Sequence, residues 1–100
     1  MLNINNMTAE NGEKIIFLEG ELDTISAQTL EEKVDELLSD TDKVVVDLEK
    51  LEYITSAGLR VLLEMKSTME ERGSIHIVHV SEDLREIFDV TGLAEIFAIE

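Results

Sequence analysis

Hydrophobic residues alternate with polar ones, or run without interruption, in several short stretches of this 100-residue chain. Alternation is typical of half-buried β-strands, and an unbroken apolar run is typical of a buried strand. These patterns predict five strands, over residues 2–7, 14–18, 43–48, 75–80 and 96–99. Because Asn11 and Gly12 lie between the first two strands and favour a tight turn, we expect these strands to form an antiparallel hairpin.

Between the strands, apolar residues recur at spacings of three and four, which predicts three helices. The first has the stripe Ala27, Leu30, Val34, Leu37 and Leu38, with Asp23, Thr24 or Ser26 as its cap. The second covers about 57–72, with an inner stripe of Leu59, Leu62, Leu63 and Met69 and with Gly73 as its C′ residue. The third begins after Ser81, carries Leu84, Ile87 and Phe88, and ends near Thr91 and Gly92.

The resulting order is β-β-α-β-α-β-α-β. Alternation of strands and helices implies parallel central strands joined by right-handed crossovers. We therefore predict a single α/β domain over residues 1–100, with a mixed sheet and helices packed on it. The β-branched run Val44-Val45-Val46 predicts a central strand that is covered on both faces.

The composition narrows the classes of partner. The chain is 44% hydrophobic, and its 23 acidic and 8 basic residues give a net charge of −15. Such a charge disfavours nucleic acid and anionic membranes. It indicates either no more than a well-solvated surface or a partner with a basic face. The chain contains no cysteine, which excludes disulfides and thiolate metal sites. With no signal peptide or membrane span in the pattern, we expect a cytoplasmic protein.

The sequence offers little catalytic chemistry. His76 and His79 are three residues apart in a predicted strand, so their side chains should point to opposite faces. Residues 56–58 match neither the P-loop nor the dinucleotide-binding pattern. We therefore predict no enzyme activity, no metal and no cofactor.

Ser56 lies where a buried strand leads into the second helix. One interpretation is that its hydroxyl caps the helix, since serine is a favoured cap. The other is an anion or phosphate position, because the first turn has free N–H groups and the positive end of the helix dipole. Arg60, one turn on, is either a solvated residue or a contact for a phosphate or an acidic partner.

Four motifs occur in the order and spacing of the STAS domain. They are Gly20-Glu21-Leu22-Asp23, Val46-Asp47-Leu48, Tyr53-Ile54-Thr55-Ser56-Ala57-Gly58-Leu59 and Phe88-Asp89-Val90-Thr91-Gly92-Leu93. They span nearly the whole chain, and they are specific together although none is specific alone. The chain resembles, more narrowly, a bacterial anti-sigma factor antagonist.

The resemblance implies that an anti-sigma factor with serine kinase activity phosphorylates Ser56, and that a serine phosphatase resets it. The unphosphorylated protein would bind the anti-sigma factor and free the sigma factor. In the family pattern Ser56 and Gly58 match, whereas Thr55 stands in place of an acidic residue and Ala57 in place of a second hydroxyl. Thr55 is therefore a second candidate acceptor. The implied partner-binding residues are Asp23, Thr24, Thr55, Ser56, Ala57, Gly58 and Arg60.

Two other functions stay open. The chain could be a STAS signalling or scaffold module of another pathway that does not use the serine switch, an alternative favoured by Thr55. It could also be an enzyme, or a small-ligand or nucleotide carrier, that uses the Ser56 loop as an anion site. The missing catalytic constellation disfavours this last function.

Overall fold

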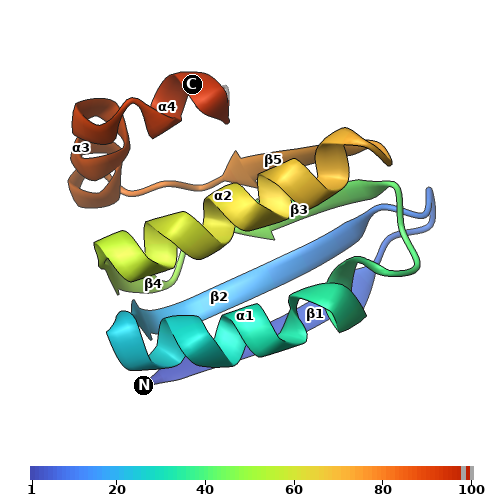
Figure 1. Cartoon of the computed structure of the whole chain (residues 1–100), viewed down its shortest axis with the longest axis horizontal. Coiled ribbons are helices and arrows are strands. Elements are labelled where there is room, and N and C mark those ends of the chain that lie inside the picture. Colours follow the sequence, from blue (N-terminus) through green and yellow to red (C-terminus); the bar gives the residue numbers. More distant parts are fainter. Residues whose placement is uncertain (98, 100) are drawn as a thin grey trace.

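A computed structural model describes residues 1–97 and 99 as one five-stranded sheet with helices packed against it (Figure 1). The strands are β1 (Leu2–Thr8), β2 (Lys14–Leu22), β3 (Lys43–Asp47), β4 (Leu51–Ile54) and β5 (Ser74–Val78). The helices are α1 (Thr24–Leu38), α2 (Ser56–Glu70), α3 (Glu82–Thr91) and α4 (Leu93–Ile96). This arrangement confirms the predicted α/β class.

β2 is the central strand of the sheet. It pairs antiparallel with β1 on one side, which confirms the predicted hairpin. On the other side its first half pairs parallel with β3, and its second half pairs parallel with β4. The pairing of β2 with β4 begins at Gly20, where φ is +96°, and its register shifts between Gly20 and Glu21. A Cβ at this position would lie 2.1 Å from the Met1 carbonyl oxygen, so only glycine fits there.

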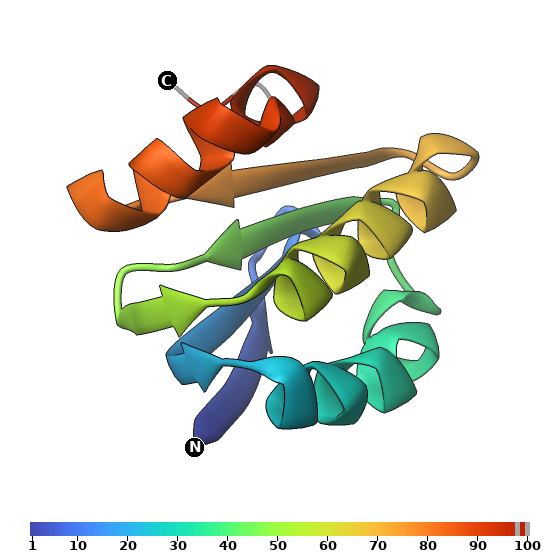
Figure 2. The same ribbon diagram turned by 60° about the vertical axis from the view of Figure 1, so that its left-hand side comes forward.

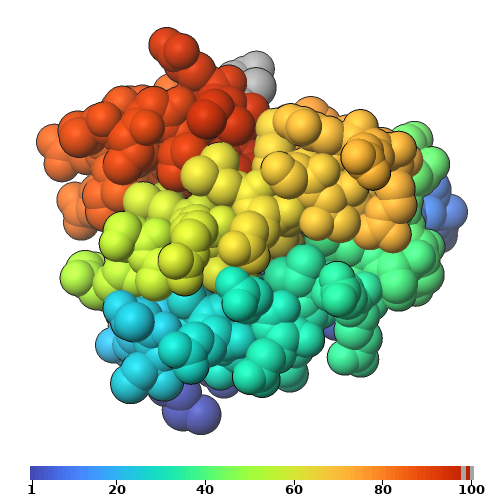
Figure 3. Space-filling view, in the orientation of Figure 1, coloured from blue at the N-terminus to red at the C-terminus, as the bar shows by residue number. Residues whose placement is uncertain are grey.

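α1 and α2 cover one face of the sheet, as Figures 2 and 3 show. Alternate strand residues point to that face and are buried beneath the helices. They are Ile16 and Leu18 of β2, Val44 and Val46 of β3, and Ile75 and Ile77 of β5. The buried stripe of α1 is the predicted one, whereas α2 buries Val61 and Met65 in addition and leaves Leu63 half-buried.

The opposite face of the sheet has no helix of the described chain packed across it. Ile15, Phe17, Val45 and Val78 lie on this open face and are half-buried. The prediction that the Val44–Val46 strand is covered on both faces is therefore wrong. β-branched residues also suit a half-buried pleated surface, so their run does not by itself show that both faces are buried.

The carboxyl end of α1 is tied to β2 by Lys14, whose side chain is buried. Its Nζ donates a hydrogen bond of 3.0 Å to the carbonyl oxygen of Leu37 and another to the carboxylate of Asp40. The last carbonyls of a helix have no intrahelical donor, and they carry the negative end of the dipole. Lys14 therefore supplies both a donor and a positive charge at that end.

Three details of the chain path differ from prediction. β4 was not among the predicted strands, because its four residues are too few to show a periodic pattern. The strand predicted over 75–80 ends at Val78. Gly73 does not adopt the left-handed conformation of a C′ residue. Glycine is needed there because a Cβ would lie 1.8 Å from the Asp42 carbonyl oxygen.

The strand predicted over 96–99 is wrong. Gly92 takes φ +80° and ends α3, and the chain then turns into α4, which contains Ile96. Phe97 follows in a turn and packs edge-on against Phe88, with 6.5 Å between ring centroids. Ala98 lies outside the described residues. None of the described helices has the length and apolar character required to cross a membrane.

Replacing Lys14 with methionine should destabilise the fold. Methionine keeps the apolar stem but leaves the Leu37 carbonyl without its charged donor, which should cost about 1–3 kcal/mol of unfolding free energy. Chemical denaturation measures this change. The matched control is Lys43→Met, which makes the same substitution at an exposed position of β3 and should change stability much less. Equal losses in both variants would contradict the role assigned to Lys14.

Candidate functional site

The candidate site is the first turn of α2, where the chain leaves β4. Thr55 is the N-cap residue, and its backbone N–H donates a 3.0 Å hydrogen bond to the carbonyl oxygen of Leu22 at the end of β2. The Thr55 carbonyl oxygen in turn accepts a hydrogen bond from the N–H of Leu59, also at 3.0 Å. These two bonds join the start of α2 directly to the central strand.

Gly58 brings the helix onto the sheet. A Cβ on Gly58 would lie 2.7 Å from Leu22 Cγ, 2.9 Å from the Leu22 carbonyl oxygen and 3.0 Å from Ile54 Cγ1. These separations are too short for any side chain, so the missing Cβ permits the close approach. Because Gly58 is buried against two strands, Ser56 is held in place two residues earlier.

α2 differs from the other long helices at its N-terminus. The Asp23 carboxylate caps α1 by accepting from the N–H groups of Ile25 (3.1 Å) and Ser26 (2.9 Å). The Ser81 hydroxyl caps α3 by accepting from the N–H of Leu84 at 3.3 Å. Among the described helices of ten residues or more, α2 alone has no side-chain cap.

The expectation that Ser56 caps α2 is wrong, because Thr55 occupies the cap position and Ser56 is the first helical residue. The Thr55 hydroxyl lies 3.5 Å from the Leu22 carbonyl oxygen and makes no cap bond. The N–H groups of Ser56, Ala57 and Gly58 therefore remain available to another acceptor. No acidic residue stands in this turn to compete for them.

The structure brings together part of the predicted site. Ser56 and Arg60 are exposed, while Thr55 and Ala57 are half-buried. Ala57 and Arg60 line a small cavity of about 60 Å³ between α1 and α2, together with Thr24. This crevice adjoins the first turns of both helices.

Asp23 has a structural role that the sequence left open between three residues. Its carboxylate caps α1, and the Ser26 hydroxyl is hydrogen-bonded reciprocally to the Asp23 backbone N–H at 2.9 Å. The hydrogen bond from the Ser26 backbone N–H is the main reason why the pKa of Asp23 lies below its ordinary value. The capping hydrogen bonds thus favour the ionised form of the carboxylate that accepts them.

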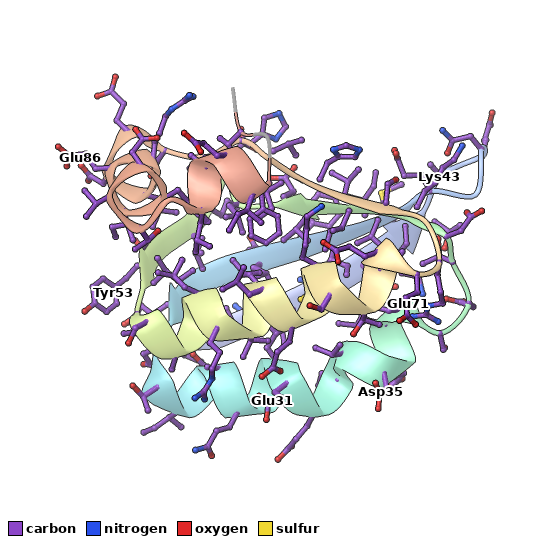
Figure 4. All side chains as sticks on the ribbon, turned by 45° about the horizontal axis from the view of Figure 1, so that its top comes forward. Glu31, Asp35, Lys43, Tyr53, Glu71 and Glu86 are labelled. Atoms are coloured by element: carbon purple, nitrogen blue, oxygen red, sulfur yellow. The ribbon has the colours of Figure 1, made fainter. Side chains whose placement is uncertain are left out.

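Three exposed apolar side chains near this end of the molecule were not predicted. Ile25 in the first turn of α1 is 79% exposed, Tyr53 of β4 is 54% exposed, and Val90 of α3 is 86% exposed. The starts of α1 and α2 lie with β4 and α3 along one side of the molecule (Figure 1), and Tyr53 points outward beside the start of α2 (Figure 4). An isoleucine within the otherwise polar first turn of α1 was the one available signal.

Comparison with known proteins identifies the family. Residues 5–100 match the STAS domain. The chain belongs to the STAS domain family. It is 33% identical over 100 residues to the anti-sigma-B factor antagonist of Bacillus subtilis, an alignment that covers 98% of this chain and 92% of that protein. It is 28% identical over 90 residues to the anti-sigma-F factor antagonist RsfB of Mycobacterium tuberculosis, covering 89% and 74% of the two chains.

Solved structures share the fold of this STAS domain. The crystal structure of an anti-sigma factor antagonist from Mycobacterium paratuberculosis superposes with a TM-score of 0.88 at 22% identity, covering 97% of this chain and 83% of that chain. This similarity confirms the predicted STAS-type architecture.

The two histidines of the STAS domain lie away from the first turn of α2, one within β5 and one directly after it. His76 is exposed in β5, whereas His79 follows the strand with a left-handed φ of 58°. The expected strand alternation therefore does not apply to His79. Its Nδ1 lies 2.9 Å from Asp47 Oδ2, and this hydrogen bond raises the pKa of His79 above its ordinary value.

Replacing Gly58 with alanine should destabilise the STAS domain and disturb the start of α2. Overpacking against Leu22 and Ile54 should cost about 1–3 kcal/mol, which exceeds the gain of up to about 1 kcal/mol that alanine gives a helix interior. Chemical denaturation measures the net loss. Ser67→Ala is the control, because it adds alanine at an exposed position of the same helix and should leave stability unchanged or raised. Similar stabilities for the two variants would contradict the close packing at Gly58.

Proposed function

We propose that this STAS domain is an anti-sigma factor antagonist. In its unphosphorylated form it binds an anti-sigma factor that is also a serine kinase, and the sigma factor is released. Phosphorylation of Ser56 ends the interaction. The observation that carries this proposal is the uncapped first turn of α2, with the exposed Ser56 at its first position, in a chain whose relatives are named anti-sigma factor antagonists.

The first turn of α2 suits a phosphoserine. A phosphate group adds about −1.5 to −2 charges and three acceptor oxygens. Free backbone N–H groups and the positive end of the helix dipole both stabilise such a group. Because Asp23 and Ser81 already satisfy the first turns of α1 and α3, the preference is specific to α2 within the described chain.

The switch should be local. The start of α2 is fixed by the Gly58 contacts and by the Thr55–Leu22 hydrogen bond, so a phosphate on the solvent side of Ser56 requires no repacking of the core. The Bacillus protein SpoIIAA has been solved in unphosphorylated and phosphorylated forms, and both resemble this chain in fold, with TM-scores of 0.70 and 0.72 at 19% and 20% identity. One fold therefore accommodates both states of that protein.

The partner-binding surface would surround Ser56. Asp23, Thr24, Thr55, Ala57 and Arg60 belong to it, whereas the buried Gly58 supports it from below. The exposed Ile25 and Tyr53 add apolar contacts. Aromatic side chains of this kind are common anchors of protein interfaces. The net charge of −15 favours a basic face on the anti-sigma factor, and a phosphate at the centre would add bulk and a costly desolvation.

Thr55 is the second candidate acceptor, but its hydroxyl is half-buried and lies next to the Leu22 carbonyl. Ser56 is the more accessible hydroxyl, so we assign phosphorylation to Ser56, with a serine phosphatase to reverse it in the cytoplasm. The threonine in place of the family's acidic residue supports one alternative, a STAS module of another pathway that binds without being phosphorylated.

Intact-mass measurement after incubation with ATP and the candidate kinase tests the switch residue. The wild type should gain one phosphate, about 80 Da, and Ser56→Ala should gain none. A gain in both proteins would move the site, and Thr55→Val would then identify Thr55. If neither protein gains mass while the kinase modifies another substrate, the alternative without phosphorylation is favoured.

Pull-down from the native lysate tests the partner. The wild-type chain should retain a histidine-kinase-like anti-sigma factor, and Ser56→Glu should retain about tenfold less, because it places a negative charge at the centre of the proposed surface. Ser67→Glu is the matched control, since it adds the same charge at an exposed position further along α2. Retention of a different stable partner, insensitive to Ser56→Glu, would contradict the antagonist function.

A further inference from the structure

A second polar cluster lies away from Ser56, at the carboxyl ends of β3 and β5. Asp47 is the last residue of β3, Glu49 lies in the turn to β4, and His79 directly follows β5. β3 and β5 are parallel neighbours, and Asp47 pairs with Val78 in their register. The two strand ends therefore bring these three side chains to one edge of the sheet.

We propose that Asp47, Glu49 and His79 form a binding site for a divalent metal ion of the zinc class. One ligand atom from each residue, an imidazole nitrogen or a carboxylate oxygen, lies within 4.8 Å of the other two. His79 Nδ1 and Asp47 Oδ2 are 2.9 Å apart. Two ligands of a tetrahedral zinc ion, with bonds of about 2.1 Å, are separated by about 3.4 Å. The His79 and Asp47 atoms therefore need to move apart by only about 0.5 Å to hold such an ion.

The backbone that carries these ligands is fixed. The N–H of Leu48 donates to the Val78 carbonyl oxygen at 3.1 Å, and Leu48 itself is fully buried. The second Asp47 oxygen, Oδ1, accepts from the N–H of Glu49 at 2.9 Å. Asp47 is thus held rigidly, with its side chain only 12% exposed, while the exposed Glu49 side chain is free to rotate onto the ion. A preformed pair plus one mobile carboxylate lowers the ordering cost of binding.

The donor set selects the class of ion. One imidazole and two carboxylates are ligands of Zn²⁺ and similar transition-metal ions, whereas magnesium and calcium favour oxygen alone. Three protein ligands leave a coordination position for water. A hollow of about 310 Å³, lined by Asp47 and Glu49 with Phe17 and Glu19, adjoins the cluster and gives that water room. The nearby Lys50 ammonium is paired with Glu19 at 3.6 Å.

The ion takes the place of the hydrogen bond between His79 Nδ1 and Asp47 Oδ2. His79 binds the ion through a ring nitrogen that carries no proton, and a neutral ring keeps its one proton on the other nitrogen. The net charge of −15 raises the local concentration of cations and favours binding.

The chain provides its own matched control, because it contains only two histidines. Isothermal titration of the full, metal-free chain with Zn²⁺ should show one saturable site. His79→Ala should weaken binding by about tenfold or more, and Glu49→Gln by several-fold. His76→Ala should stay within about twofold of wild type, since His76 is exposed on β5 outside the cluster.

Two results would overturn the proposal. Unsaturable binding by the wild type would mean that the acidic surface collects ions without a site. Equal weakening by His76→Ala and His79→Ala would place any site between the histidines instead. NMR of the wild-type imidazole signals removes the dependence on folded variants, because Zn²⁺ should shift the His79 signals much more than those of His76. This test does not involve Ser56, so its outcome is independent of the antagonist function.

Discussion

The contact between Gly58 and the end of β2 determines the geometry of the candidate site. Leu22 Cγ and the Leu22 carbonyl oxygen occupy the space that a Cβ of Gly58 would need, and the same carbonyl accepts from the Thr55 N–H. α2 therefore begins at one fixed point on the sheet, with Ser56 on its solvent side. Under the proposed function, a phosphate added to this hydroxyl would change the charge of the surface while the core beneath it stays packed.

Much of the fold could be predicted from the sequence because burial on one face imposes a clear period. The stripe of α1 is of this kind. The start of β2 was recognised instead from its unbroken apolar run, residues 15–18. β4 could not be predicted, since Glu52 and Tyr53 are exposed and four residues carry no period. The apolar residues Ile96 and Phe97 were assigned to a strand because a short apolar run does not distinguish a strand from a helical turn that packs on Phe88.

The candidate site was predicted in position but not in detail. The motif located Ser56 at the start of α2, whereas the assignment of the cap to Thr55 depends on where the helical dihedral angles begin, which is a matter of one residue. The exposure of Tyr53 depends on tertiary packing, so no local pattern reveals it, whereas Ile25 stands out within the first turn of α1. The meeting of His79 with Asp47 likewise depends on β3 and β5 being neighbours in the sheet.

The central place of β2 has a consequence for the motions of this domain. β2 is hydrogen-bonded along both edges, to β1 on one side and to β3 and β4 on the other, so its amides should be among the last to exchange with solvent. The start of α2 is attached to the end of this strand at Leu22. Opening of the Ser56 turn should therefore be coupled to the least frequently opened part of the molecule. Under the proposed function, the kinase would have to recognise Ser56 in its folded, helical setting.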